Sequence, residues 1–266
     1  MAQEKWLLDG PKTIDLENIR RLKVGLVGGH IDIVGHDESG VRVEVHSVSG
    51  RDLLVQVDGD RLEIDHPQLR WDNWIDVFKN FGSSIKAEVS VLVPRSVAVT
   101  LGVVSAEALV VGLEADVQLN TVSGDVVADG LTGKLTANSV SGEVTVRDHT
   151  GRVGVNTVSG DVIASGAITK FDVDGVSSAV MLDASGVPDV VGVNTVSGAV
   201  TARFEPNTPA SYTVQTVGGK LRLDAQSITV VKGRYTARHG SLEERWTDVR
   251  VNTVGGDVSI LHAVRA

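Results

Sequence analysis

The sequence predicts an all-β protein, namely a single-domain parallel β-solenoid with about 18-residue coils, one short helical excursion and a late hairpin insertion. Three observations support this prediction. One segment repeats at constant spacing, the composition is 42% hydrophobic but only 4% aromatic, and 29 of the 266 residues are glycine. Short valine-rich strands joined by tight turns have this composition.

The repeated segment reads Asn-Thr-Val-Ser-Gly-Asp-Val in its clearest form. Its copies, some of them degenerate, begin at Asn120, Asn138, Asn156, Asp174, Asn194, Gln215 and Asn252. The first four are spaced by 18 residues, and the later ones by 20, 21 and 37. Because one such unit cannot bury its own apolar face, a fixed period indicates units that stack as successive coils.

Equivalent residues of stacked strands lie about 4.8 Å apart, so each repeated position should form a column. The predicted core columns begin at Val122, Val126, Leu135 and Ala137 and continue at the same period. The asparagines predict a structural ladder in which each side-chain amide donates to the next and satisfies a buried turn. Its members are Asn120, Asn138, Asn156, Asn194 and Asn252. The Ser-Gly pair marks a sharp corner.

One domain is expected over residues 1–266. N-terminal strands should extend to residue 65, a helical excursion should occupy residues 66–84, and regular coils should fill residues 85–262. An insertion at residues 221–251 has the pattern of a hairpin, with a turn at Lys232-Gly233.

The helical excursion is predicted from aromatic and apolar residues at helical spacing. These residues are Trp71, Trp74, Ile75, Phe78 and Phe81. Such a face must bury against something, and covering an edge of the solenoid is the first interpretation. Docking of a protein partner is the alternative, which makes Trp71, Trp74, Phe78 and Phe81 candidate partner-binding residues.

Charge and composition exclude several classes of partner. The formal net charge of −9 disfavours nucleic acid and anionic membranes. Neither a signal peptide nor an apolar run of about 18 residues is recognisable, so we expect no direct membrane insertion. A cytoplasmic location is the default expectation, with envelope association left open. The chain contains no cysteine, and its seven histidines have no metal-ligand spacing and are interpreted as surface residues.

Stacking should also align acidic residues along one corner. This file consists of Glu107, Asp125, Glu143 and Asp161. A divalent cation such as calcium could bind there, but a solvated edge is the preferred interpretation because Ala179, Ala199 and Lys220 interrupt the file. We predict no catalytic residue, no metal site and no cofactor, and we do not expect an enzyme. Carboxylate pairs such as Asp183 and Asp189 leave polysaccharide cleavage as a minor alternative.

The runs of Thr-Val-Ser-Gly-Asp-Val between short alternating strands resemble the DUF4097 family of β-strand-repeat proteins, labelled "putative adhesin". The resemblance implies a β-solenoid without known catalytic activity, often associated with bacterial envelope stress. We therefore expect a non-enzymatic scaffold or binding module for a protein or glycan of unknown identity. The alternative is a self-assembling structural protein whose uncapped C-terminal coil stacks end to end as a homo-oligomer.

Overall fold

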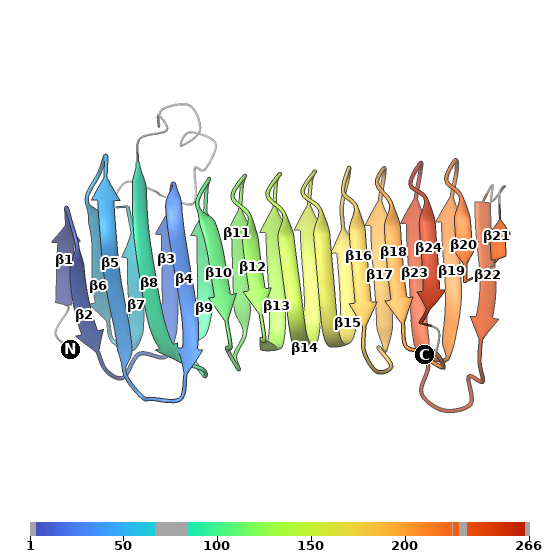
Figure 1. Ribbon diagram of the computed structural model, residues 1–266, viewed down its shortest axis with the longest axis horizontal. Helices are drawn as coiled ribbons and strands as arrows, with labels where there is room; N and C mark the ends of the chain where they lie inside the picture. The colour runs from blue at the N-terminus through green and yellow to red at the C-terminus, as the bar shows by residue number, and fades with distance from the viewer. Residues whose placement is uncertain (1–3, 67–84, 225, 229–232, 264–266) are drawn as a thin grey trace. The chain divides into compact units, whose positions relative to one another are not determined.

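The computed structural model describes residues 4–66, 85–224, 226–228 and 233–263, and this part of the chain is all-β, as predicted. It contains no helix, and hence none that could cross a membrane. The helical excursion predicted over residues 66–84 lies outside the described residues, apart from His66. The chain divides into two compact units, Met1–Thr132 and Gly133–Ala266, and each is described by itself (Figure 1).

Unit 1 mixes parallel and antiparallel strands. Its strands are β1 (Glu4–Leu8), β2 (Lys12–Leu16), β3 (Arg21–Leu26), β4 (Gly29–His36), β5 (Val41–Ser49), β6 (Leu53–Asp58), β7 (Arg61–Asp65), β8 (Lys86–Pro94), β9 (Ala98–Val103), β10 (Glu107–Val111), β11 (Val117–Thr121) and β12 (Val126–Asp129). β3 pairs in parallel with β7 and β9, and β4 pairs in parallel with β8 and β10.

The expectation of parallel pairing throughout is wrong near the N-terminus. β1 pairs antiparallel with β6, β6 with β7, β2 with β5, and β5 with β8. The turn between β6 and β7 shows the local cause, because Gly59 adopts φ 63° in a two-residue loop. Such a loop returns the chain directly as a hairpin, whereas parallel pairing needs a longer connection.

Unit 2 contains the clearest repeats. Its strands are β13 (Thr132–Ser139), β14 (Val144–Thr157), β15 (Val162–Asp174), β16 (Val180–Ala184), β17 (Val190–Thr195), β18 (Val200–Phe204), β19 (Ala210–Thr216), β20 (Leu221–Leu223), β21 (Gln226–Ile228), β22 (Gly233–His239), β23 (Thr247–Thr253) and β24 (Val258–His262). β14 and β15 pair in parallel with Val144 opposite Val162 and Val153 opposite Phe171, which is the register that the period predicts.

The core of unit 2 is built from columns of such paired residues. Val153, Phe171, Val191, Val249 and Tyr212 lie opposite one another in successive pairs, and all five are buried. Each inward side chain packs on the equivalent side chains of its neighbouring strands, so the apolar column is continuous.

The C-terminal coil lies inside the stack of strands, so the prediction that it is uncapped is wrong. β23 pairs in parallel with both β17 and β19, and β24 with both β18 and β20. Figure 1 shows red β23 and β24 between the orange strands on either side. Val249 and Val251 of β23 are fully buried, and this central position removes their apolar surface from water on both sides.

Most of the first strand of the predicted late hairpin, together with Lys232 of its turn, lies outside the described residues. Among the described strands nearby, β21 pairs antiparallel with β20, and β22 pairs antiparallel with β19. Every residue of β22 is exposed or half-buried. A strand with no fully buried side chain gains least from a central position, which explains why β22 lies outside β19.

Candidate functional site

A buried hydroxyl group forms hydrogen bonds to the backbone of the corner that follows the Asn-Thr or Asn-Ser pair of the repeat. In unit 2, Thr157 Oγ1 lies 3.1 Å from both the carbonyl oxygen and the amide nitrogen of Gly160. Ser139 Oγ donates to the carbonyl oxygen of Gly142 at 2.6 Å, and in unit 1 Thr121 Oγ1 donates to that of Gly124 at 2.5 Å. The inward hydroxyl thus satisfies the turn that the asparagines were expected to satisfy.

The asparagines themselves lie on the outer surface, where they form a ladder of amides. In unit 2, Asn156 Nδ2 donates to Asn138 Oδ1 at 2.9 Å. Asn252 Nδ2 donates to Asn194 Oδ1 at 2.7 Å, and Asn194 Nδ2 donates to Asp174 Oδ1 at 2.7 Å. Asn156, Asn194 and Asn252 are exposed rather than placed in a buried turn. Asn120, in unit 1, donates to the carbonyl oxygen of Leu101 at 3.2 Å.

The valine that follows each buried threonine points outward, so the core column predicted from Val122 is wrong. Val122 and Val140 are half-buried, and the later members in unit 2 leave about half of their surface exposed, from 46% at Val176 to 66% at Val217. We call these later members the valine row, which consists of Val158, Val176, Val196, Val217 and Val254. Side chains alternate across a strand, so an inward threonine requires an outward valine.

A groove runs between the amide ladder and the valine row. It consists of two adjoining hollows of about 360 and 560 Å³, which share Gly175 and Asn194 in their walls. We call it the amide groove and define it by the exposed residues of the ladder positions and of the valine row that line it, which are Asn156, Val158, Asp174, Val176, Asn194, Val196, Gln215, Val217, Asn252 and Val254. Asp174 and Arg234 are the charged residues among those that line it.

Gly175 lies where the two hollows of the amide groove meet. It occupies the repeat position that holds threonine or serine in neighbouring coils, and the nearest atoms to an added Cβ would be Ser178 Cβ at 3.4 Å and Oγ at 3.5 Å. These are ordinary contact distances, and Ser178 is fully buried. A side chain at this position would therefore point inward, like that of Thr157, and would not enter the amide groove.

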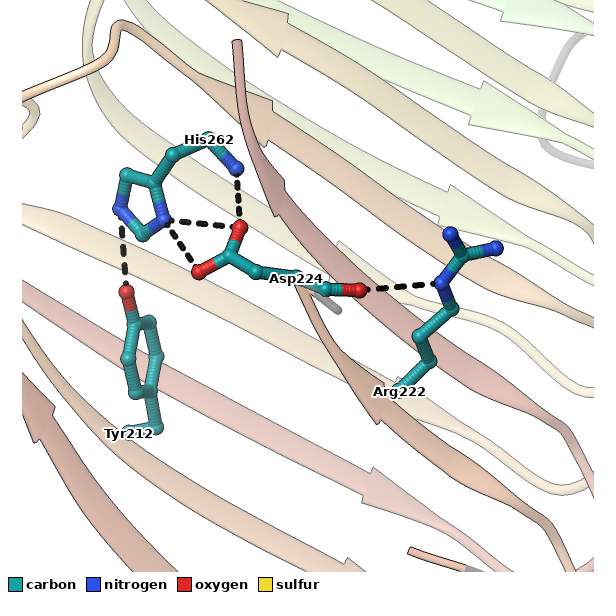
Figure 2. A network of polar contacts seen from close by, with 4 residues as sticks. All are labelled: Tyr212, Arg222, Asp224 and His262. Atoms are coloured by element: carbon teal, nitrogen blue, oxygen red, sulfur yellow. Dashed lines mark hydrogen bonds and ion pairs between the residues drawn. The ribbon is translucent and has the colours of Figure 1, made fainter. Parts of the chain in front are cut away.

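A second polar cluster lies at the strand ends of the C-terminal coil (Figure 2). His262 Nδ1 lies 3.1 and 3.2 Å from the two carboxylate oxygens of Asp224, and His262 Nε2 lies 3.1 Å from the hydroxyl of Tyr212. The ring of His239 stacks on that of His262, with centroids 3.8 Å apart. Burial, together with the Asp224 charge, raises the pKa of Tyr212 above its usual value, which keeps its hydroxyl protonated.

The histidines were not all interpreted correctly from the sequence. His66 and His149 are buried, and the side chain of His262 is only 6% exposed. His239 and His262 are 23 positions apart in the sequence, and no short motif links them. They meet because of the strand pairing, in which β24 pairs with β20 and β22 pairs with β19. No local spacing in the sequence indicates this arrangement.

The remaining candidates are explained by structural contacts or lie outside the described residues. Asp183 pairs with Arg203, and Asp189 Oδ1 pairs with Arg245 at 3.0 Å. In the acidic file, Asp161 Oδ1 accepts a hydrogen bond from the amide of Ala179 at 2.8 Å, which links two successive coils. Candidate partner-binding residues Trp71, Trp74, Phe78 and Phe81 lie outside the described residues.

The fold and the groove together define the class of protein. It is a protein of repeated β-strands whose surface carries an elongated groove lined by both polar and apolar side chains. The chain belongs to the DUF4097 family, described as Toastrack, because the family model matches residues 19–261. The comparison with curated proteins finds no match.

Solved structures similar to this chain show low sequence identity. One is a "putative lipid binding protein" from Parabacteroides distasonis, with 12% identity, coverage of 96% of this chain and 95% of that chain, and a TM-score of 0.44. Others are "putative adhesins" from Bacteroides fragilis (9%, 94% and 97%, TM-score 0.42) and Parabacteroides merdae (10%, 97% and 96%, TM-score 0.41). At these values, none of the names transfers to this chain.

Proposed function

We propose that this protein is a non-enzymatic binding module and that the amide groove holds an extended, uncharged glycan chain. We also infer that the coils of unit 2 form a parallel β-solenoid. The observation that carries the functional proposal is the row of exposed amides along the groove, in which Asn252, Asn194 and Asp174 are joined by hydrogen bonds across paired strands.

The spacing of the amides favours a glycan over a peptide. Rungs of the ladder follow the separation of neighbouring strands, about 4.8 Å. An extended peptide places the side chains of one face about 6.6 Å apart, so their spacing does not match the spacing of the rungs. The rings of an extended β-linked polysaccharide advance by nearly the strand separation, so each ring can meet the same pair of groups.

The chemistry of the groove also suits sugar rings. A primary amide has two donor and two acceptor positions, and on Asn194 the ladder uses one donor and one acceptor. Hydroxyl groups, which both donate and accept, can bind the remaining positions. The exposed side chains of Val196 and Val254 offer apolar contact to the C–H faces of the rings. Few charged groups line the groove, which favours an uncharged chain.

The test is calorimetric titration with soluble uncharged β-linked oligosaccharides. The informative variant is Asn194→Ala/Asn252→Ala, which removes two neighbouring amides of the ladder from the wall of the groove. We expect the wild-type protein to bind and the variant to bind at least about tenfold more weakly, a loss of about 1.4 kcal/mol. Circular dichroism checks that the variant is folded.

A matched control alters two polar residues outside the groove. Thr201 and Ser259 lie opposite each other on β18 and β24, so Thr201→Ala/Ser259→Ala removes side-chain hydroxyls from neighbouring coils. We expect this control to bind like the wild type. Failure of every oligosaccharide to bind, or equal binding by Asn194→Ala/Asn252→Ala, would overturn the glycan proposal. Shortening of the oligosaccharide during incubation would overturn its non-enzymatic part.

A further inference from the structure

Three side chains with metal-binding chemistry meet at the strand ends of unit 2. Asp224 follows β20, His239 ends β22 and His262 ends β24. One carboxylate oxygen and one ring nitrogen from each histidine all lie within 4.8 Å of one another. Imidazole and carboxylate are the ligands of zinc sites that combine nitrogen and oxygen donors.

The orientation of His262 is fixed by its partners on both sides. Its backbone amide donates to Asp224 Oδ1 at 2.6 Å, and its ring nitrogen Nε2 lies 3.1 Å from the hydroxyl of Tyr212 (Figure 2). The other ring nitrogen, Nδ1, faces a carboxylate that can only accept. This nitrogen must therefore carry a proton or share a cation with the carboxylate.

We propose that Asp224, His239 and His262 bind a divalent transition-metal ion of the zinc type. The ligands of a tetrahedral zinc ion, at about 2.0–2.1 Å from the metal, are separated by roughly 3.3 Å. The separation of 3.1 Å between His262 Nδ1 and Asp224 Oδ2 is close to that value. Tyr212, bonded to the second ring nitrogen, acts as a positioning residue that holds the imidazole in place.

Binding requires one movement, a rotation of the His239 ring. In the structure, the two histidine rings are nearly parallel, with an angle of 12° between them, so their in-plane lone pairs do not converge. His239 is half-buried at the end of the strand β22, which pairs with β19. Rotation would replace the ring stack with a shared metal ion and would link the ends of β20, β22 and β24.

The experiment uses protein without a histidine tag and Zn²⁺ alone as the probe. We expect calorimetry to show one Zn²⁺ bound per chain, and the unfolding temperature to rise with Zn²⁺ concentration. His239→Ala should weaken binding at least about tenfold, and Tyr212→Phe should weaken it by a similar factor. The matched control is His46→Ala, which removes an exposed histidine of unit 1.

A second measurement needs no variant. Modification of the wild-type protein by diethyl pyrocarbonate, followed by mass spectrometry, should show His239 protected by Zn²⁺ and His46 unprotected. No Zn²⁺ binding, binding equal in wild type and His239→Ala, or unchanged modification of His239 would each overturn the proposal. The readout is independent of the amide groove, so failure of one proposal leaves the other standing.

Discussion

At the scale of single residues, the glycine of the Thr-Val-Ser-Gly segment is required by the backbone of the neighbouring coil. A Cβ on Gly160 would overlap the carbonyl oxygen of Gly142 in the adjacent coil. Gly154, on β14 of the same unit, has no atom within 4 Å of an added Cβ. Close approach of the neighbouring coil therefore requires glycine at position 160 but not at position 154. The sequence alone does not distinguish the two positions.

This contrast predicts different costs for the same substitution. We expect Gly160→Ala to lower the free energy of unfolding by about 1–3 kcal/mol, because the coils must move apart to admit the methyl group. Gly154→Ala should change it by less than about 0.5 kcal/mol. Urea denaturation measures both values. A similar small effect for the two variants would show that close approach of the coils is not what fixes Gly160.

A single carboxyl group in unit 1 predicts a pH dependence of stability. Burial raises the pKa of Asp65 from 3.8 to about 7. Between these two pH values the folded protein keeps a proton that the unfolded chain has released, so the free energy of unfolding falls as pH rises through this window. Above about pH 7 the loss is complete.

Asp65→Asn removes this titration. Urea denaturation at a series of pH values should show the variant gaining stability over the wild type as pH rises from 3.8 to about 7. Comparing the two proteins cancels the contributions of His66 and His149, whose pKa values are lowered by burial. A difference between variant and wild type that does not change with pH would contradict the assignment.

At the scale of elements, the position of the C-terminal coil predicts its protection from hydrogen exchange. β23 has hydrogen-bonded partners on both sides, whereas β22 has β19 as its one partner among the described strands. The amides of β23 should therefore exchange at least about tenfold more slowly than those of β22, although β23 is closer to the C-terminus. If the amides of β23 exchange as fast as those of β22, the position of β23 between β17 and β19 is contradicted.

Sequence reasoning succeeded for the elements where the period is strict. The constant spacing predicted that Val153 lies opposite Phe171, because an unbroken repeat fixes both the pairing and the register. It failed where the spacing loosens. Chain order places the coil of Gln215 next to that of Asn194, but Asn252 lies opposite both Asn194 and Gln215, so the last coil comes between them.

The candidate sites were harder to predict than the strands. The asparagine ladder is visible in the repeat, but the groove beside it depends on Val176 and its equivalents facing outward. The cluster of Asp224, His239 and His262 depends on the order of strands across the sheet. That order is a property of tertiary packing, which short-range sequence patterns do not encode.

At the scale of the whole molecule, the repeated rungs imply that binding strength depends on ligand length. Each added sugar of an extended chain should meet another amide and another valine of the amide groove, until the chain passes the last rung at Gln215 and Val217. A ligand that uses one isolated pocket would instead gain nothing beyond the sugars that fill it.

The most direct measurement is therefore a calorimetric titration of the wild-type protein with one series of uncharged β-linked oligosaccharides of increasing length. We predict that the affinity rises with each added sugar and then levels off once the chain spans the amide groove, and that Asn194→Ala/Asn252→Ala reduces this rise. An affinity that is independent of length, or a length dependence that Asn194→Ala/Asn252→Ala leaves unchanged, would contradict a function based on the repeated groove.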